Sequence, residues 1–257
     1  FCAIRPVQER RAIVRAFLHF SEVPMSEVFN RETAPAGGYD LVVFDWDGTV
    51  LDTTAAIALS IQHACEKMRL PVPSTKLANS VIGLGWREAI RIIAPTCPVE
   101  EYQTFSKYYA AHYRSLENEV HLFPGIEALI RALASAGVTL AVATGKSRRG
   151  LDRVLKMTGL AECFSAPRTA DMGASKPNPD MLEEIGIETC IAAERTIMVG
   201  DTTHDLYMAR AYGCRGIGVT YGAMSAESLL EAEPILLCND VPALARALGA
   251  DVLLAKA

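Results

Sequence analysis

Short apolar runs alternate with longer amphipathic stretches along most of the chain. The apolar runs are Leu41–Phe44, Val138–Thr144, Cys163–Ser165, Thr196–Asp201, Gly216–Thr220 and Ile235–Leu237. Short runs of this kind, bounded by turn residues, are typical of strands buried on both faces of a parallel sheet. The amphipathic stretches predict helices at about 125–136, 147–158, 178–191, 203–212, 225–232 and 241–249. This alternation predicts an α/β fold with a doubly wound parallel sheet.

The interval between the first two predicted strands carries only helical patterns, which are separated by prolines. Helices are expected directly after Thr53, from Ser74 or Thr75, over Trp86–Ile93 and over about Val99–Leu116. The last of them has an aromatic stripe that we expect to pack between helices, made by Tyr102, Phe105, Tyr109 and Tyr113. The chain is thus predicted to have a core, residues 39–53 and 122–257, and an all-helical insert, residues 54–121.

The first 38 residues do not fit the alternation. The sequence opens on Phe1, and Thr33–Gly38 is small and rich in Pro and Gly, as in linkers. Two interpretations fit: an Arg-rich transit peptide, or a fragment or misplaced start upstream of Met25. We interpret residues 1–38 as an N-terminal tail, either disordered or a non-native extension, and expect residues 1–24 to be dispensable for stability and activity.

Composition and charge narrow the class of protein. Half of the residues are hydrophobic, the net charge is −5 and the basic residues form no long runs, which argues against nucleic-acid or membrane partners. No apolar run approaches the length of a transmembrane helix. The seven cysteines are widely spaced without a Cys-x-x-Cys pair. We therefore expect no disulfide framework or zinc site, a cytoplasmic location, and a monomer or small homo-oligomer.

Two aspartates stand directly after the first predicted strand. Asp45 and Asp47 are one residue apart and are followed by Gly48. Ligands bind beyond the carboxyl ends of the strands in an open α/β sheet, so both carboxylates are expected at the mouth of a site. A turn-forming Asp-Gly would explain Asp47, but Asp45 would be a costly charge at the end of a core strand. A hard cation relieves that cost, and oxygen ligands suit Mg²⁺.

Two further stretches offer groups that could bind phosphate. Thr144 and Gly145 end the second predicted strand before a helix, where a hydroxyl and free N–H groups form a phosphate cradle; an ordinary N-cap is the alternative. We interpret Lys146 as a solvated residue at the helix start. Lys176 lies in Ser175–Asp180 between small residues and two prolines, which suits a positioned charge, while an exposed lysine in a rigid loop is the alternative.

A second pair of acids follows the predicted strand over Thr196–Asp201. Asp201 stands at the strand end, with the same burial cost as Asp45, and Asp205 lies one turn into the next helix. For Asp205 a plain acid at a helix start is the alternative. We interpret His204 as a surface residue or an outer residue of the site rather than a ligand. Acids from two strand ends are thus predicted to meet at one site.

These stretches resemble the four motifs of the haloacid dehalogenase superfamily, over about residues 39–249. Asp45–Thr49 resembles the first motif, and the adjoining Val50–Thr53 resembles the subfamily containing phosphoglycolate phosphatases. Thr144, the Lys-Pro-x-Pro run at 176–179 and the Gly-Asp-x-x-x-Asp run at 200–205 resemble the second, third and fourth. The resemblance implies a Rossmann-like core with a helical cap inserted after the first strand, closing over the active site on two hinges.

The resemblance also implies a phosphatase that acts on a small phosphorylated metabolite, similar to phosphoglycolate, through an aspartyl phosphate. Asp45 would be the nucleophile. Asp47 would protonate the departing alkoxide and then take a proton from the attacking water. Thr144, the Lys176 ammonium and the N–H groups after Asp45 would bind the phosphoryl oxygens, and Gly145 would belong to the same phosphate-binding turn as Thr144.

A Mg²⁺ site is implied by the same resemblance. Its ligands would be Asp45, the backbone carbonyl of Asp47, Asp201 and, directly or through water, Asp205. In the cap, the irregular stretch before Arg87 is a candidate substrate-facing loop. Arg87 would there bind a substrate carboxylate, and the alternative is an arginine on a helix surface.

Other functions of the same superfamily fit less of the sequence. Dehalogenases lack the second aspartate of the first motif, and phosphonoacetaldehyde hydrolases replace it with a small residue, so Asp47 argues against both. A non-catalytic binding protein of this fold is expected to have lost Asp45 or Asp47. A β-phosphoglucomutase-like phosphotransferase would retain every catalytic residue and is the alternative function.

Overall fold

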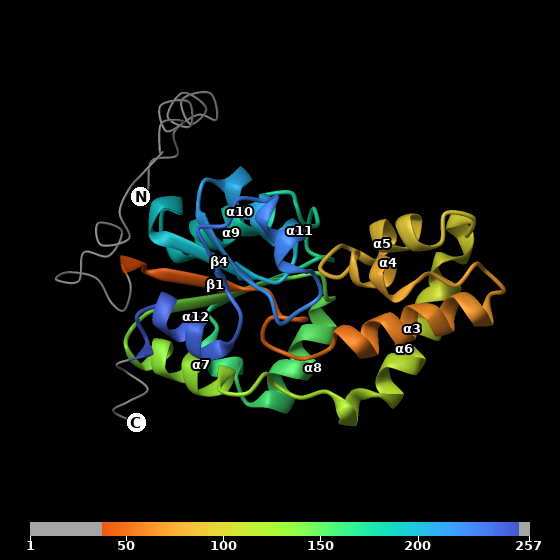
Figure 1. Cartoon of the computed structure of the whole chain (residues 1–257), viewed down its shortest axis with the longest axis horizontal. Helices are drawn as coiled ribbons and strands as arrows, with labels where there is room; N and C mark the ends of the chain where they lie inside the picture. The colour runs from red at the N-terminus through yellow and green to blue at the C-terminus, as the bar shows by residue number, and fades with distance from the viewer. Residues whose placement is uncertain (1–37, 252–257) are drawn as a thin grey trace.

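A parallel sheet of six strands forms the centre of the chain (Figure 1). The structure, a computed structural model, describes residues 38–251. The predicted N-terminal tail lies outside this range apart from Gly38. The expectation that residues 1–24 are dispensable and the possible start at Met25 therefore also fall outside the described residues. The strands are β1 Leu41–Phe44, β2 Thr139–Thr144, β3 Ala166–Thr169, β4 Thr196–Gly200, β5 Arg215–Val219 and β6 Leu236–Cys238. Their order β3-β2-β1-β4-β5-β6, with every neighbouring pair parallel, confirms the predicted fold class.

One predicted strand is wrong. Cys163–Ser165 was expected to be a strand, but Cys163 closes a short 3-10 helix, Ala161–Cys163, and β3 begins at Ala166. Because β3 is an edge strand, it can contain a proline, Pro167, which lacks a backbone donor. Its Pro167 and Arg168 are half-buried, so the strand lacks the continuous apolar run that marks the central strands.

Helices cover both faces of the sheet (Figure 1). The helices of the core are α7 Ile126–Ser135, α8 Arg148–Thr158, α9 Asp180–Thr189, α10 Thr203–Tyr212, α11 Ala226–Leu230 and α12 Val241–Ala247. Side chains alternate along β1, so that Val42 and Phe44 pack with α7, α8 and α12, whereas Leu41 and Val43 pack with α9 and α10. The helix positions confirm the sequence pattern to within about two residues at each end, the usual scatter of helix ends.

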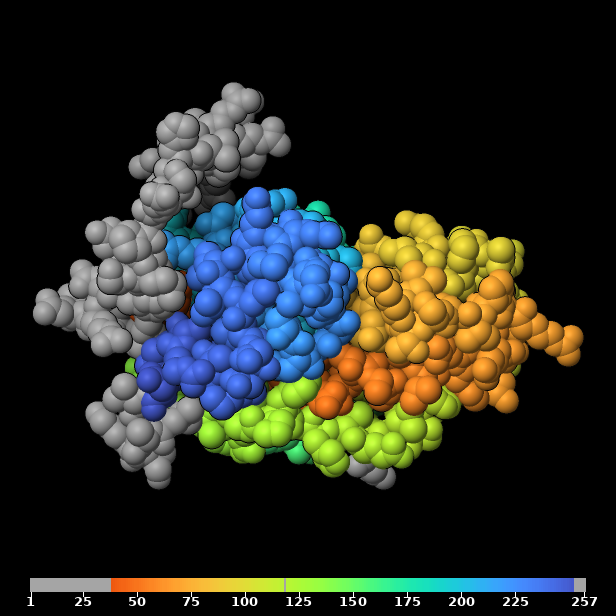
Figure 2. Space-filling model, viewed as in Figure 1, coloured from red at the N-terminus to blue at the C-terminus, as the bar shows by residue number. Residues whose placement is uncertain are grey.

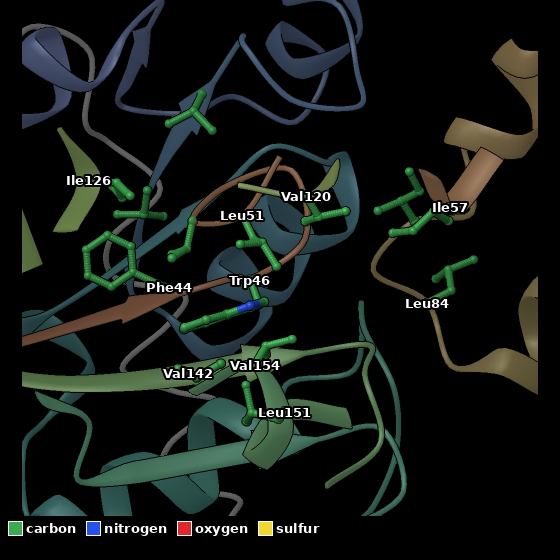
Figure 3. Packing of buried hydrophobic residues seen from close by; sticks show 14 of the residues in the cluster. Phe44, Trp46, Leu51, Ile57, Leu84, Val120, Ile126, Val142, Leu151 and Val154 are labelled. Carbon is green, nitrogen blue, oxygen red and sulfur yellow. The ribbon is translucent and has the colours of Figure 1, made fainter. Parts of the chain in front are cut away.

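Aromatic packing fixes the end of β1. The rings of Phe44 and Trp46 are buried and both meet Phe164 edge to face, at centroid distances of 6.3 and 5.9 Å. Figure 3 shows both rings among the aliphatic side chains of β2 and α8. Burial of roughly 150–250 Å² by each ring contributes several kcal/mol. Asp45 and Asp47 lie on either side of Trp46, so this packing holds both acids in place.

The insert between β1 and β2 is helical, as predicted. It contains α3 Thr54–Lys67, α4 Thr75–Asn79, α5 Trp86–Ile93 and α6 Tyr102–Ser115, with 3-10 helices at Val99–Glu101 and Glu117–Glu119. Tyr102, Phe105 and Tyr113 of α6 are buried, which confirms the aromatic stripe as a packing face. The insert lies beside the carboxyl end of the sheet (Figure 1), and its atoms abut those of the C-terminal part of the chain (Figure 2).

Six cysteines fall within the described range, and all of them are free thiols. Among the helices of residues 38–251, none combines the length and the apolar character needed to cross a bilayer. The cytoplasmic location, the lack of nucleic-acid partners and the oligomeric state stay predictions.

Candidate active site

The ends of β1 and β4 bring the first two acids together. The strands are neighbours with Phe44 opposite Val199, and the Asp45 N–H donates to the Val199 carbonyl at 2.9 Å. The chain leaves β1 toward β2 on one side and leaves β4 toward β5 on the other. Such a reversal of strand order opens a crevice at the carboxyl edge of the sheet. Asp45 and Asp201 therefore meet where the fold favours a ligand.

Three carboxylates form a buried cluster at this point. Asp45, Asp201 and Asp205 have no exposed surface, and one oxygen of each lies within 4.8 Å of the others. Lys176 is also fully buried, with Nζ 2.8 Å from Asp45 Oδ1 and 2.6 Å from Asp205 Oδ1. The alternative of an exposed loop lysine is therefore wrong. Ionisation of all three carboxylates around the one ammonium would leave an excess of negative charge.

One oxygen of Asp45 has no protein partner in the described range. Oδ1 accepts the Trp46 N–H at 2.6 Å and contacts Lys176, whereas Oδ2 is buried without a hydrogen bond among residues 38–251. Buried carboxylate oxygens are almost always satisfied. Gly83 of the insert adopts φ +89°, and a Cβ there would lie 3.8 Å from Oδ2. Since glycine has no side chain, room remains above Oδ2. The residues thus fit a hard divalent cation such as Mg²⁺.

Asp201 is held by two loops. Thr49 Oγ1 donates to its Oδ1 at 3.0 Å, and the Ala223 N–H donates to its Oδ2 at 2.7 Å. Gly48, at φ +77°, and Gly222 both approach it so closely that a Cβ on either would collide with the carboxylate. Neither Thr49 nor Gly222 was predicted from the sequence to contact an acid of the site. A glycine in the loop after β5, at the same edge of the sheet as Asp45, is the signal that could have indicated Gly222.

Asp205 has two occupied oxygens. Oδ1 binds Lys176, and Oδ2 accepts the Thr202 N–H at 3.1 Å and the Thr202 hydroxyl at 2.7 Å in a capping box that begins α10. It is therefore both an acid at a helix start and part of the cluster. Its contacts show that it positions Lys176, while binding of the metal by Asp205 and by the Asp47 carbonyl stays a prediction.

Burial and crowding shift the pKa values in the cluster. Burial raises the pKa of Asp45 to about 7, against the lowering effect of the Lys176 ammonium. Burial, followed by the Asp45 and Asp205 charges, raises the pKa of Asp201 well above its ordinary value. Burial alone would lower the pKa of Lys176, but Asp205 and Asp45 raise it overall, so this side chain stays an ammonium.

Mg²⁺ should raise the melting temperature, and more so at higher pH. An unfolded Asp has a pKa of about 3.9, so between about pH 4 and about pH 7 folded Asp45 keeps a proton that the unfolded chain has lost. The stability of the metal-free protein should therefore fall as pH rises through this window. A bound cation competes with the proton on Asp45. The increase in melting temperature caused by Mg²⁺ should therefore become larger as the pH rises. At about a hundred times its Kd, Mg²⁺ should contribute about 2.7 kcal/mol, or roughly 5 °C or more.

Two variants control the melting experiment. Asp201→Asn removes a charged oxygen of the cluster and should eliminate the Mg²⁺-dependent shift. Asp152→Asn changes an exposed acid on α8 that pairs with Arg148 at 2.9 Å, and it should retain the shift. An equal shift in wild type and Asp201→Asn, measured by calorimetry at about pH 8 and about pH 5, would place the cation elsewhere.

Asp47 lies next to the cluster and is 7% exposed. Its Oδ1 accepts the Thr53 hydroxyl at 2.7 Å and lies 2.8 Å from Lys146 Nζ. The interpretation of Lys146 as a solvated helix-start residue is therefore wrong: its side chain is only 12% exposed because it folds back toward Asp47. The contact of Thr53 with Asp47 was not predicted from the sequence either. This threonine is the N-cap of α3 but makes no side-chain cap bond, because its hydroxyl donates to Asp47 instead.

Thr144 and Gly145 lie at the same edge of the sheet. Thr144 is buried at the end of β2, and its Oγ1 accepts the Lys146 N–H at 3.2 Å. A Cβ on Gly145 would come within 2.7 Å of the backbone of Gly83 and Leu84. Glycine therefore allows the insert loop to rest on the turn after β2. Phosphate binding by Thr144 and Gly145 stays a prediction.

Two other residues considered in the sequence lie in the insert or contact it. Arg87 is exposed, and its guanidinium carbon lies 5.0 Å from the centroid of the Trp86 ring. This position favours the alternative of a helix-surface arginine, and binding of a substrate carboxylate stays a prediction. His204 Nε2 lies 2.9 Å from the Ser80 carbonyl oxygen. It contacts the insert, in agreement with its interpretation as an outer residue of the site.

Known proteins are similar to this chain in sequence and in fold. The sequence profile described as haloacid dehalogenase-like hydrolase matches residues 42–219. The chain is 34% identical over 208 residues to Probable phosphatase IndB of Dickeya dadantii, covering 77% of this chain and 89% of that protein. It is 33% identical over 216 residues to a phosphoglycolate phosphatase of Agrobacterium fabrum, covering 81% of this chain and 91% of that protein. The crystal structure of a predicted phosphatase from Clostridium acetobutylicum aligns with this structure with a TM-score of 0.71 and 27% sequence identity. The alignment covers 81% of this chain and 97% of that chain.

Proposed function

The chain belongs to the haloacid dehalogenase-like hydrolase family, and we propose that it is a Mg²⁺-dependent phosphatase that hydrolyses a small phosphomonoester. The buried Asp45 carboxylate supports this proposal most strongly, because it is held by Lys176 while one of its oxygens has no protein partner within residues 38–251. The similarity to phosphoglycolate phosphatases favours phosphoglycolate or a comparable ester as substrate.

The first half of the reaction transfers the phosphoryl group to Asp45. A carboxylate oxygen attacks phosphorus, an acyl phosphate bond forms, and the P–O bond to the leaving alcohol breaks. Asp47 donates its proton to the departing alkoxide, which would otherwise be a poor leaving group. Charge builds on the phosphoryl oxygens in the transition state. The Lys176 ammonium and the Thr144 hydroxyl are available to stabilise it.

The second half releases inorganic phosphate. Asp47 is now ionised and takes a proton from a water molecule, whose oxygen attacks phosphorus as the bond to Asp45 breaks. This step restores the Asp45 carboxylate and the protonated Asp47. When bound by Asp45 and Asp201, Mg²⁺ would supply positive charge that offsets the negative charge on the phosphoryl oxygens.

The insert limits the size of the substrate. Asp45 has no exposed surface, and the insert loop at Gly83 lies directly over it. His204 reaches the Ser80 carbonyl, and Ser175 Oγ donates to Glu88 Oε2 at 3.0 Å, so the insert is held against the core. The insert must open to admit a substrate, and a small ester fits a site that closes this completely.

A panel of phosphorylated metabolites tests the proposal. Phosphate release should be measured with Mg²⁺ for phosphoglycolate, a hexose phosphate and a nucleoside monophosphate, with phosphoglycolate expected to have the highest kcat/KM. A chelator should lower turnover by at least about 10²-fold, and Mg²⁺ should restore it. Unchanged turnover in chelator would contradict the metal assignment. Isomerisation of the hexose phosphate, activated by a sugar bisphosphate and without net phosphate release, would assign a phosphotransferase instead.

A further inference from the structure

Lys146 is a largely buried cation, with 12% of its side chain exposed, and it takes no part in the reaction steps proposed so far. It follows Thr144 and Gly145 at the end of β2, and its ammonium lies 2.8 Å from Asp47 Oδ1. Burial alone would lower the pKa of Lys146, but the Asp47 carboxylate outweighs that effect and raises it above its ordinary value. The side chain therefore carries a full positive charge next to the acid that serves the leaving group.

Two donors converge on one oxygen of Asp47. The Thr53 hydroxyl, at 2.7 Å, and the Lys146 ammonium, at 2.8 Å, both contact Oδ1. Thr53 comes from the start of α3 and Lys146 from the turn after β2, so the carboxylate is fixed from two sides. Neither contact uses Oδ2, which can therefore face the leaving oxygen.

The same ammonium also contacts the insert. Lys146 Nζ donates to the Tyr113 hydroxyl at 3.5 Å and lies 5.1 Å from the centroid of that ring. Tyr113 is stacked on Tyr109, with centroids 5.9 Å apart and planes inclined by 18°. Both tyrosines belong to α6, so Lys146 connects this helix to the acid of the core.

We propose that Lys146 is a positioning residue that orients Asp47 toward the leaving oxygen when α6 of the insert is seated against the core. The inference rests on the proposed phosphatase function. It adds a connection between closure of the insert and the proton transfer. An open insert would remove the Tyr113 contact and leave Lys146 free to move away from Asp47. Protonation of the leaving group would then be efficient only in the closed site, where water is excluded.

Substitution of Lys146 should affect leaving groups unequally. Lys146→Met removes the ammonium and keeps much of the side-chain length. It should lower kcat/KM for an alkyl phosphate by about 10–100-fold. This loss is smaller than the full rate enhancement from a general acid, because Asp47 is still present but less well oriented. The burst of p-nitrophenolate from p-nitrophenyl phosphate, which reports phosphorylation of Asp45 without need of a proton, should stay within about threefold of wild type. Lys146→Arg keeps a cation at this position and should recover part of the loss.

A double-mutant cycle with Asp47→Asn separates positioning from a general structural role. If Lys146 acts through Asp47, Lys146→Met should cost almost nothing further in the Asp47→Asn background. Additive losses on the alkyl ester would overturn the proposal. A rise in KM restricted to carboxylate-bearing esters would also overturn it, because Lys146 would then bind the substrate. Asp45→Asn tests the phosphatase mechanism independently, so failure of the two ideas can be distinguished.

Two further variants test the contact with the insert. Tyr113→Phe keeps the ring and its stacking but removes the hydroxyl, and it should lower kcat/KM for the alkyl ester about threefold more than for the aryl ester. Arg153→Met removes a different contact between the core and the insert, the ion pair of Arg153 on α8 with Glu117 at 2.7 Å, and should leave the ratio of the two esters unchanged. Equal losses on both esters in Tyr113→Phe would contradict the link to α6.

Discussion

Asp45→Asn should retain its fold and lose at least about 10³-fold in kcat/KM, which corresponds to about 4 kcal/mol of transition-state stabilisation. An amide has nearly the size of a carboxylate, so the packing at the end of β1 should survive. Lys176 keeps its contact with Asp205 at 2.6 Å, so its charge remains paired. The amide cannot form an acyl phosphate by attack on phosphorus, and the covalent route is closed.

The matched control for Asp45→Asn is Asp52→Asn. Asp52 lies in the same loop but is exposed, and its substitution should leave kcat/KM within about twofold of wild type, as is usual at a surface position. Melting temperatures of both variants should be measured beside the kinetics. Activity of Asp45→Asn within tenfold of wild type would mean that another residue forms the bond to phosphorus.

Asp47→Asn should slow the hydrolysis of an alkyl phosphate by about 10²–10⁴-fold. An alkoxide is strongly basic and needs a proton as it leaves, and the amide has no acidic proton to give. Nitrophenolate leaves without help, so phosphorylation of Asp45 by p-nitrophenyl phosphate should stay fast. The intermediate should then hydrolyse slowly, because the same carboxylate activates the water.

The expected record for Asp47→Asn with the aryl ester is a burst of nitrophenol followed by slow turnover. Its amplitude should approach one equivalent per active site. Stopped-flow absorbance measures both phases. Equal losses on the alkyl and aryl esters without a burst would instead assign Asp47 to holding the loop or the metal. The Asp52→Asn variant should show wild-type phases with both esters.

Much of the fold was predictable because the central strands carry continuous apolar runs and the helices are amphipathic. The exception is β3, where edge position allows Pro167 and half-buried Arg168 to replace an apolar run. A search for apolar runs cannot reveal a strand whose half-buried positions are a proline and an arginine. The position of β3, the edge strand next to β2, therefore became clear only from the structure.

The acids of the site were predictable for a related reason. A charge at the end of a buried strand, as at Asp45 and Asp201, has few structural explanations. Lys146 was misjudged because helix-start lysines are usually solvated, and no local pattern shows that this one folds back to Asp47. The roles of Thr53 and Gly222 depend on contacts between separate loops. Such contacts exist only after the sheet has brought those loops together.

The proposed reaction places the phosphoryl group on Asp45, and a rapid acid quench can detect it there. Wild type and Asp47→Asn should be mixed with substrate and Mg²⁺, quenched during turnover, digested and analysed by mass spectrometry. We expect the peptide that spans Asp45 to gain the mass of one phosphoryl group, with greater occupancy in Asp47→Asn, and Asp45→Asn to gain none. A phosphoryl group on a different residue, or an unmodified protein throughout a burst, would contradict the account.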